Sequence, residues 1–160
     1  MNPQADPKVI CNSVLGAEMD ETECQTLAGI MKVIQLHDGD ILVQDGEVNS
    51  NLHLLAQGRI RAENCLQQHL CVLYEMNIGE LAGTRAFVDN TPRRATMRAA
   101  GDATVYALAP EDFEKLTESH PRLVYKVMRA VFRMTYINLM RVDDESEQLK
   151  NYVFKAHGRY

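Results

Sequence analysis

The chain has 160 residues, of which 46% are hydrophobic and 24% are charged, and its formal net charge is −5. This balance is typical of a soluble globular protein, and we assign residues 1–160 to a single domain. The sequence has no apolar run of about 18 residues, which argues against a membrane span, and its acidity argues against a broad nucleic-acid-binding surface.

The first residues, MNPQADPKVICNSV, lack the charged and long apolar segments of a secretory signal, so we expect a cytoplasmic protein. In that reducing compartment, cysteines without CxxC spacing are expected to be buried free thiols. These are Cys11, Cys24, Cys65 and Cys71. His69 and Cys71 would share one strand face near Cys65, but a metal site needs about three or four converging ligands. We therefore expect no metal site.

The predicted elements begin with helical structure over residues 9–31, interrupted near Gly16 and the segment MDETE. From Lys32 the segment KVIQLHDGDILVQDG predicts two short strands on either side of a turn at residues 37–40. NLHLLAQGRIRAEN, HLCVLYEM and RATMRAAGDATVYALA continue the strands with Gly and Asp turns. Short strands separated by such turns indicate a mainly β antiparallel jelly-roll barrel over residues 30–109. In the segment NLHLLAQGRIRAEN, apolar Leu52, Leu54 and Ala56 alternate with polar His53 and Gln57.

Helices are predicted again after residue 109. One helix opens at Pro110 and ends near Ser119, and Pro121 begins a longer helix that reaches about Val142. Segment 143–160 is expected to be a tail in which DDESE forms a solvated break or helix face. The longer helix has two apolar faces, one formed by Leu123, Val127, Ala130, Met134 and Ile137, the other by Tyr125, Met128, Phe132, Tyr136 and Leu139. One face can pack on the barrel, whereas the other requires a second subunit, a ligand, or a C-terminal segment that folds back over it.

The window IGELAGTRAFVDNTPRRATMRA holds four arginines and two acidic residues in an otherwise acidic chain. We predict a short helix beginning at Glu80, whose free N–H groups would face an anion, while Gly79 would let the main chain approach it closely. Arg93 follows Pro92 and could bind the same anion through two parallel hydrogen bonds. A carboxylate beside a phosphate would be repelled, so Glu80 should face sugar hydroxyls. The alternative is a simple buried ion pair between Glu80 and Arg93.

The motif GEL, a short helix and then PRRAT resemble the phosphate-binding cassette of cyclic nucleotide-binding domains. These are the modules of protein kinase A regulatory subunits, cyclic-nucleotide-gated channels and the catabolite activator family. The segment HDGDILVQDGEVNSNLHLLAQGRIR is similar to the first strands of that family, and residues 110–142 are similar to its B and C helices. The resemblance covers residues 30–142 and implies a β-roll flanked by an N-terminal helix and the C-terminal B and C helices.

The resemblance also implies the ligand contacts. Glu80 would bind the ribose 2′-hydroxyl, Arg93 would bind the cyclic phosphate, and Gly79 would keep its turn. Counting from Pro121, Asn138 falls where the catabolite activators offer a polar side chain to the purine. The remaining phosphate contacts would come from the backbone amides of Leu81, Ala82 and either Arg94 or Ala95.

Two features depart from the family pattern. The segment from Glu80 to Arg93 is longer by about one helical turn, which could displace the amides. Arg94 stands where cyclic-AMP binders have Ala or Ser and cyclic-GMP binders have Thr, so it either reaches a second phosphate or points to solvent. Cyclic AMP, cyclic GMP and a cyclic dinucleotide therefore stay open as ligands, and so does a ligand-free β-roll that serves as a protein-interaction module.

The sequence carries no grouping of a nucleophile with a base, and Glu80 has no paired carboxylate within its window, so we expect no enzymatic activity. Residues 143–160 contain no second helix pair and no wing, so we expect no DNA binding. The expected protein is a non-catalytic regulatory sensor of cyclic AMP or cyclic GMP without a further cofactor. Its expected partners are a second copy, bound through the C-terminal helix, and an unidentified effector protein, with no membrane partner.

Overall fold

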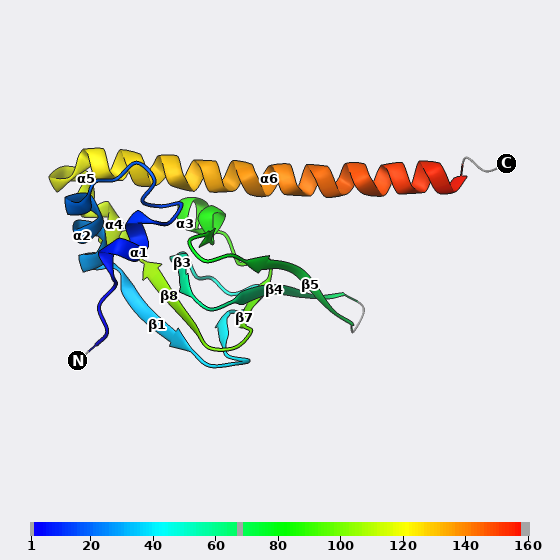
Figure 1. Cartoon of the computed structure of the whole chain (residues 1–160), viewed down its shortest axis with the longest axis horizontal. Helices are drawn as coiled ribbons and strands as arrows, with labels where there is room; N and C mark the ends of the chain where they lie inside the picture. Colours follow the sequence, from blue (N-terminus) through cyan, green and yellow to red (C-terminus); the bar gives the residue numbers. More distant parts are fainter. Residues whose placement is uncertain (1, 67–68, 158–160) are drawn as a thin grey trace.

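The computed structural model describes residues 2–66 and 69–157, which form a β-roll with helices at both chain ends (Figure 1). This architecture confirms the predicted jelly roll with flanking helices. The helices are α1 (Pro7–Cys11), α2 (Glu21–Ile30), α3 (Thr84–Asp89), α4 (Pro110–Glu114), α5 (Leu116–Ser119) and α6 (Pro121–His157). The strands are β1 (Lys32–Leu36), β2 (Ile41–Val43), β3 (Leu52–Gln57), β4 (Ile60–Leu66), β5 (His69–Met76), β6 (Leu81–Ala82), β7 (Thr96–Ala99) and β8 (Ala103–Leu108).

Two antiparallel sheets make up the roll, with strand orders β1-β8-β3-β6 and β2-β7-β4-β5. Strands β1 and β2 follow each other in the chain but belong to different sheets, so the turn between them carries the chain across. Asp40 closes this turn by accepting a hydrogen bond from the His37 N–H at 2.8 Å. Gly39 adopts a positive φ of 85°, which a residue with a Cβ rarely does.

Strand β3 lies at the centre of the core, because neither of its faces is solvated. Leu54 packs in the cluster beneath the helices, whereas its neighbour Leu55 packs inside the roll. His53 is only 1% exposed, so the apolar and polar residue types that alternate along this strand do not correspond to buried and solvated positions. The reason is that β3 pairs with β8 on one side and β6 on the other while layers cover both of its faces.

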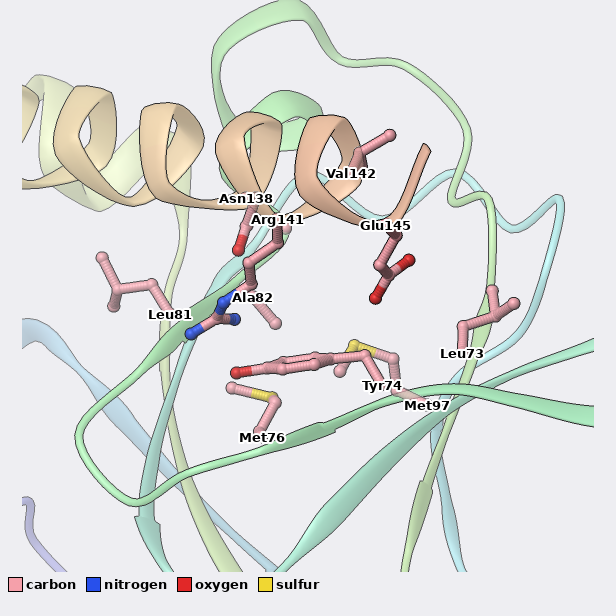
Figure 2. A pocket seen from close by; sticks show the side chains of 11 residues that line it. Leu73, Tyr74, Met76, Leu81, Ala82, Met97, Asn138, Arg141, Val142 and Glu145 are labelled. Atoms are coloured by element: carbon pink, nitrogen blue, oxygen red, sulfur yellow. The ribbon is translucent and has the colours of Figure 1, made fainter. Parts of the chain in front are cut away.

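Helix α6 crosses the roll along the long axis of the molecule (Figure 1). It has 37 residues and continues to His157 instead of ending near Val142, so residues 143–147 are a helix face and no part of 143–157 folds back. Arg141 and Glu145 project from it toward the roll (Figure 2). The predicted inner face is buried at Leu123, Val127, Ala130 and Met134, although Ile137 is exposed. The predicted outer face is exposed at Tyr125, Met128, Phe132, Tyr136 and Leu139.

Within residues 2–66 and 69–157, no helix is both long and apolar enough to cross a bilayer.

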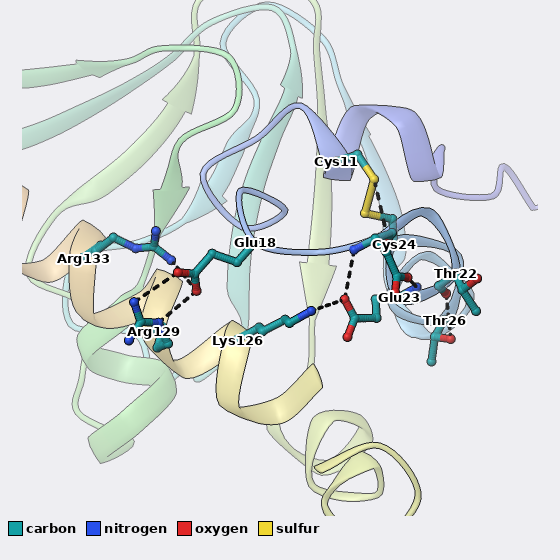
Figure 3. Close-up of polar contacts among 10 residues, drawn as sticks. Cys11, Glu18, Thr22, Glu23, Cys24, Thr26, Lys126, Arg129 and Arg133 are labelled. Atoms are coloured by element: carbon teal, nitrogen blue, oxygen red, sulfur yellow. Dashed lines mark hydrogen bonds and ion pairs between the residues drawn. A yellow bond between two sulfur atoms is a disulfide. The ribbon is translucent and has the colours of Figure 1, made fainter. Parts of the chain in front are cut away.

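Ion pairs hold the first half of α6 to the N-terminal segment (Figure 3). Glu18 accepts two hydrogen bonds from Arg129 at 2.9 and 3.0 Å and lies 3.2 Å from Arg133. The hydrogen bond from Arg129 lowers the pKa of the Glu18 carboxyl below its usual value. Glu23 caps α2 and also accepts from Lys126 at 2.6 Å. These contacts tie the start of α6 to the N-terminal segment, in addition to the apolar packing of the helix.

A disulfide joins Cys11 at the end of α1 to Cys24 in α2, with 5.9 Å between the two Cα atoms (Figure 3). The expectation of four buried free thiols is therefore wrong. Cys24 is buried, but it lies beside Cys11 because α1 and α2 pack together, and this proximity brings the sulfurs within bonding distance. Cys65 and Cys71 are free, and they are exposed and half-buried respectively.

Breaking this disulfide is expected to destabilise the fold. The two cysteines are separated by 13 residues, and a closed loop of that size contributes about 2–3 kcal/mol to the free energy of unfolding. Urea denaturation of the oxidised protein and of the Cys11→Ser variant measures the difference. Cys65→Ser, which removes an exposed free thiol, is the control and should stay within about 0.5 kcal/mol of the parent. Equal midpoints for Cys11→Ser and the oxidised parent would contradict this expectation.

Candidate ligand-binding site

The predicted helix beginning at Glu80 is wrong. The arginine-rich window begins instead with a tight turn and a short strand. The Glu80 N–H donates to the Asn77 carbonyl at 3.1 Å, and Leu81 then pairs with Leu54 of β3. Helix α3 starts only at Thr84, after Gly83. Pairing with the central strand and burial of the Leu81 side chain decide this, so the amides of Leu81 and Ala82 belong to strand β6 instead of a helical first turn.

Gly79 keeps the turn role predicted for it, at a φ of 88°. Its N–H donates to the Leu55 carbonyl at 2.8 Å, and its carbonyl accepts from the Val14 N–H at 2.9 Å. A Cβ on this residue would lie 3.4 Å from the Ser13 Cα. The close approach that Gly79 permits is therefore to the N-terminal segment and not to a ligand cavity.

A cavity of about 420 Å³ lies between α6 and the edge strands β5 and β6, which belong to different sheets (Figure 2). Three of the predicted site residues line it, namely Leu81, Ala82 and Asn138. Its walls are largely apolar, with a few polar side chains reaching in from α6. The lining residues are Leu73, Tyr74, Met76, Leu81, Ala82, Gly83, Met97, Asn138, Arg141, Val142 and Glu145.

A smaller hollow of about 210 Å³ adjoins this cavity, because Gly83 and Met97 line both. The smaller hollow contains three of the four arginines in the window, including the predicted Arg93 and Arg94. Arg94 is exposed and Arg93 is buried. The lining residues are Gly83, Arg85, Ala86, Thr91, Pro92, Arg93, Arg94, Ala95 and Met97. A small hollow bordered by three arginines thus opens next to the larger cavity.

The loop after α3 positions Arg93. The helix ends at Asn90, which takes the left-handed conformation at a φ of 53°. Three residues later, the Arg93 N–H donates to the Glu47 carbonyl at 2.9 Å and its carbonyl accepts from Gly46 at 2.8 Å. Pro92 restricts the chain between these points. The main chain of Arg93 is therefore anchored to the β2–β3 connection, which orients its side chain inward.

The guanidinium of Arg93 lies against main-chain atoms, and the side chain is 7% exposed. Its Nε donates to the Asn49 carbonyl at 2.7 Å, and its Nη2 donates to the Asn51 carbonyl. A Cβ on Gly83 would lie 1.9 Å from Nη1, so only a glycine at that position leaves room for the guanidinium. Sequence reasoning missed Gly83, although a glycine directly before a helix is a local signal.

His53 contacts the same guanidinium, with 3.4 Å between its Nδ1 and Nη2 of Arg93. Burial, and then the charge of Arg93, lowers the pKa of His53 to about 3. The ring is therefore neutral near pH 7 and can accept a hydrogen bond from the guanidinium. Burial also lowers the pKa of Arg93, but a guanidinium stays protonated in proteins, so the hollow keeps its positive charge.

The carboxylate of Glu80 is engaged by other groups than Arg93. One oxygen accepts from the Tyr74 hydroxyl and from the Asn77 N–H at 3.1 Å. The other accepts from Asn77 Nδ2 at 3.3 Å and from Arg141 Nη2 at 3.0 Å. The alternative of a direct Glu80–Arg93 ion pair is thus not the arrangement found. Arg93 lines the smaller hollow, whereas Glu80 lines neither of the two and reaches the larger one only through Tyr74 and Arg141.

Tyr74 and Arg141 are site residues that sequence reasoning missed. The Arg141 guanidinium lies 4.7 Å from the centroid of the Tyr74 ring, and both line the larger cavity. Asn138, Arg141 and Glu145 share one helix face by their spacing. That spacing was readable, but the expected helix end near residue 142 hid the pattern.

The sequence matches the model of the cyclic nucleotide-binding domain family over residues 33–120, which is more than half of the chain. The chain therefore belongs to this family. It is 28% identical over 90 residues to the cAMP-dependent protein kinase regulatory subunit of Candida albicans, covering 56% of this chain and 19% of that one. It is 22% identical over 115 residues to the lysophospholipase NTE1 of Mycosarcoma maydis, and this match covers 72% of this chain and 6% of that one. The chain thus spans under one fifth of the length of these relatives.

Solved structures share the fold. A cyclic nucleotide-binding domain from Methylobacillus flagellatus superposes with a TM-score of 0.82 at 16% identity, over 91% of this chain and 86% of that one. The catabolite activator protein of Thermus thermophilus superposes with a TM-score of 0.75 at 23% identity, over 86% of this chain and 63% of that one. The regulatory domain of Toxoplasma gondii protein kinase A, crystallised with cAMP, gives 0.60 at 19% identity, over 68% and 42%. At these identities the likeness establishes the fold alone.

Acidification is expected to destabilise the fold through His53. Its pKa is about 3 in the folded protein against 6.5 for an ordinary histidine, so between these values the unfolded chain binds the extra proton. The stability due to neutral His53 is complete above pH 6.5 and falls by about 1.4 kcal/mol per pH unit as the pH drops toward 3. Urea denaturation across this range measures the slope.

His53→Gln, which lacks a titrating ring, should lose this component of the slope. The matched control is His37→Gln, which changes a histidine whose side chain is 86% exposed and should keep the parental slope. Identical slopes for the two variants would show that His53 does not control the acid sensitivity.

Proposed function

We propose that this chain is a non-catalytic regulatory protein that binds cyclic AMP or cyclic GMP between the β-roll and α6. The observation that supports this best is the pair of adjoining hollows. The smaller one is lined by Arg93 and Arg94, and the larger one by Tyr74 and Asn138. A cyclic nucleotide has groups that suit these residues, with a charged phosphate ring at one end for the arginines and a flat base at the other. The larger cavity falls within the range of about 300–1,000 Å³ that is usual for small-molecule sites.

In this proposal the phosphate occupies the smaller hollow and is bound by Arg93, with Arg94 available from the exposed side. The ribose lies beside Glu80, and the base enters the larger cavity toward Met97 and Asn138. Helix α6 forms one wall of that cavity, so a bound ligand would contact both the roll and the helix. Such shared contacts can shift the position of α6, because a ligand favours the conformation that it binds more tightly.

We extend the proposal to a homodimer formed through the outer face of α6, as defined by Tyr125, Met128, Phe132, Tyr136 and Leu139. All five side chains are exposed in the single chain, and Phe132 is 72% exposed. They recur three or four residues apart along the helix, as in helices that pair side by side. A second copy would cover this apolar face, and a cytoplasmic effector protein would respond to the dimer.

A ligand-free interaction module is the second candidate. It is favoured by the fact that both charged groups already have partners: Arg93 donates to two carbonyls, and Glu80 accepts from Tyr74, Asn77 and Arg141. In that case a partner protein would bind the outer face of α6, and Arg93 would only stabilise the loop. Mass spectrometry of protein purified without added nucleotide would distinguish an occupied site from an empty one.

Replacing Arg93 is expected to abolish tight nucleotide binding. Arg93→Ala removes the phosphate contact and should cost at least about 2 kcal/mol of binding free energy, because a hydrogen bond to a charged group is lost. Calorimetric titration with cyclic AMP and with cyclic GMP gives the affinities. Arg98→Ala is the matched control, since Arg98 belongs to the same window but pairs with Glu63 and lines neither hollow.

Absence of both binding heat and thermal shift at millimolar nucleotide would reject the proposed function. Binding that Arg93→Ala and Arg98→Ala weaken equally would reject the phosphate assignment. A competition experiment compares the affinity for a cyclic dinucleotide with that for the mononucleotides. The dinucleotide is a candidate ligand because exposed Arg94 lies where a second phosphate could be bound. If the dinucleotide binds more tightly, it becomes the proposed ligand in place of the mononucleotide.

Introducing a charge on the outer face of α6 is expected to disrupt the dimer. Phe132→Glu would place carboxylates within an apolar interface, and the resulting desolvation cost should shift the protein to monomer. Size-exclusion chromatography with light scattering measures the mass. Val48→Glu is the control, because Val48 is also exposed, at 66%, but lies in the β2–β3 connection. A parent protein that is monomeric at high concentration would contradict the dimer.

A further inference from the structure

The hydrogen-bond acceptor positions of the Glu80 carboxylate are occupied by donors of the protein itself. It accepts four hydrogen bonds, from the Tyr74 hydroxyl, the Asn77 N–H, Asn77 Nδ2 and Arg141 Nη2. A carboxylate has about four lone-pair positions, so this set uses its capacity. A ribose hydroxyl can therefore donate to Glu80 only if one of these donors leaves.

Arg141 is the donor that can leave most easily. Tyr74 is held on strand β5, and Asn77 belongs to the turn that Glu80 itself closes. Arg141 instead reaches Glu80 from α6, across 61 positions of sequence, on a long side chain that is 37% exposed. Moving it requires a change of side-chain rotamer, whereas moving the other donors requires changes in the sheet or the turn.

The guanidinium of Arg141 also uses only some of its hydrogen-bond donors. Its Nη2 binds Glu80 and its guanidinium covers the Tyr74 ring at 4.7 Å. Its Nη1 is buried, and no described residue accepts a hydrogen bond from it. An unpaired buried donor carries a free-energy cost, which weakens the closed arrangement.

The Arg141–Glu80 ion pair lies about two helical turns beyond Arg133, which is the next ion-paired residue toward the start of α6. Lys126, Arg129 and Arg133 anchor the first half of the helix to the N-terminal segment, whereas Arg141 connects the second half to the roll. Loss of this one pair would therefore leave the first half in place and loosen the second half.

We propose that Arg141 is a specificity-determining residue that competes with the ligand's 2′-hydroxyl for Glu80, so that a ribonucleotide displaces Arg141 and loosens the second half of α6. This inference rests on the proposed nucleotide site. The incoming hydroxyl donates to the Glu80 oxygen that Arg141 Nη2 occupied, and the freed guanidinium turns to solvent. A 2′-deoxy ligand cannot make this exchange, and it leaves the Arg141–Glu80 pair closed.

Removing Arg141 should tighten binding of a ribonucleotide and leave a 2′-deoxynucleotide unaffected. Calorimetry on the full chain compares cyclic AMP or cyclic GMP, whichever the parent binds, with its 2′-deoxy analogue. Arg141→Met is expected to raise the affinity for the ribonucleotide at least about threefold, because the competing ion pair is gone. The affinity for the 2′-deoxy analogue should change less than about twofold. Arg141→Gln serves as a second variant in case the methionine disturbs folding.

Arg133→Met is the matched control. Arg133 is also an arginine of α6 that pairs with a carboxylate and has a buried nitrogen without a described partner, but it does not line the cavity. Its replacement should leave the affinity ratio of the two ligands unchanged. Amide hydrogen exchange gives an independent readout, since the ribonucleotide but not its 2′-deoxy analogue should accelerate exchange in α6 beyond residue 138 of the parent.

Weaker or unchanged ribonucleotide binding by both Arg141 variants, with the parent still binding, would overturn the competition by Arg141 and leave the proposed function standing. The same holds if the two ligands change exchange in α6 equally. Failure of the parent to bind any cyclic nucleotide would overturn both. A gain restricted to the ribonucleotide, absent from Arg133→Met, is the result that supports the role of Arg141.

Discussion

The packing of α6 across the helix-side face of the roll is the constraint on which the site depends. Leu123, Val127 and Met134 are buried in the same cluster as Leu52 and Leu54 of the central strand. This apolar contact fixes the helix over the sheet edge, and the cavity exists because the helix continues past the end of that contact. Burial of each such side chain contributes about 1.5–3 kcal/mol, so the helix position is set by packing and only adjusted by its ion pairs.

The local concentration of arginines in an acidic chain follows from how their charges are used. Arg98 pairs with the buried Glu63 of β4, and Arg93 is enclosed by carbonyl oxygens beside Gly83. Arg94 stays exposed next to it. Carbonyl partners of the buried Arg93 guanidinium do not neutralise it, so a small region stays positive while the whole protein is negative.

Helix α6 is held differently along its length. Its first half is tied to the N-terminal segment, which the Cys11–Cys24 disulfide further restrains, and its second half contacts the roll near Glu80 through Arg141. Among the described residues, the first half thus has more ion pairs than the second. Local opening of the second half would have a smaller free-energy cost than global unfolding.

The sequence by itself determined the β-roll, the turn at Gly79 and the inner face of α6, because period-two and period-3.6 patterns depend on near neighbours. It also predicted Glu80 and Arg93 as ligand-binding residues, and this stays a prediction. Only the tertiary structure decided that Leu81 joins a strand, that Cys11 meets Cys24, and that Tyr74 and Arg141 hold Glu80. These outcomes depend on which distant segments come together. Local periodicity carries no information about that choice, since any of several donors could satisfy the same carboxylate.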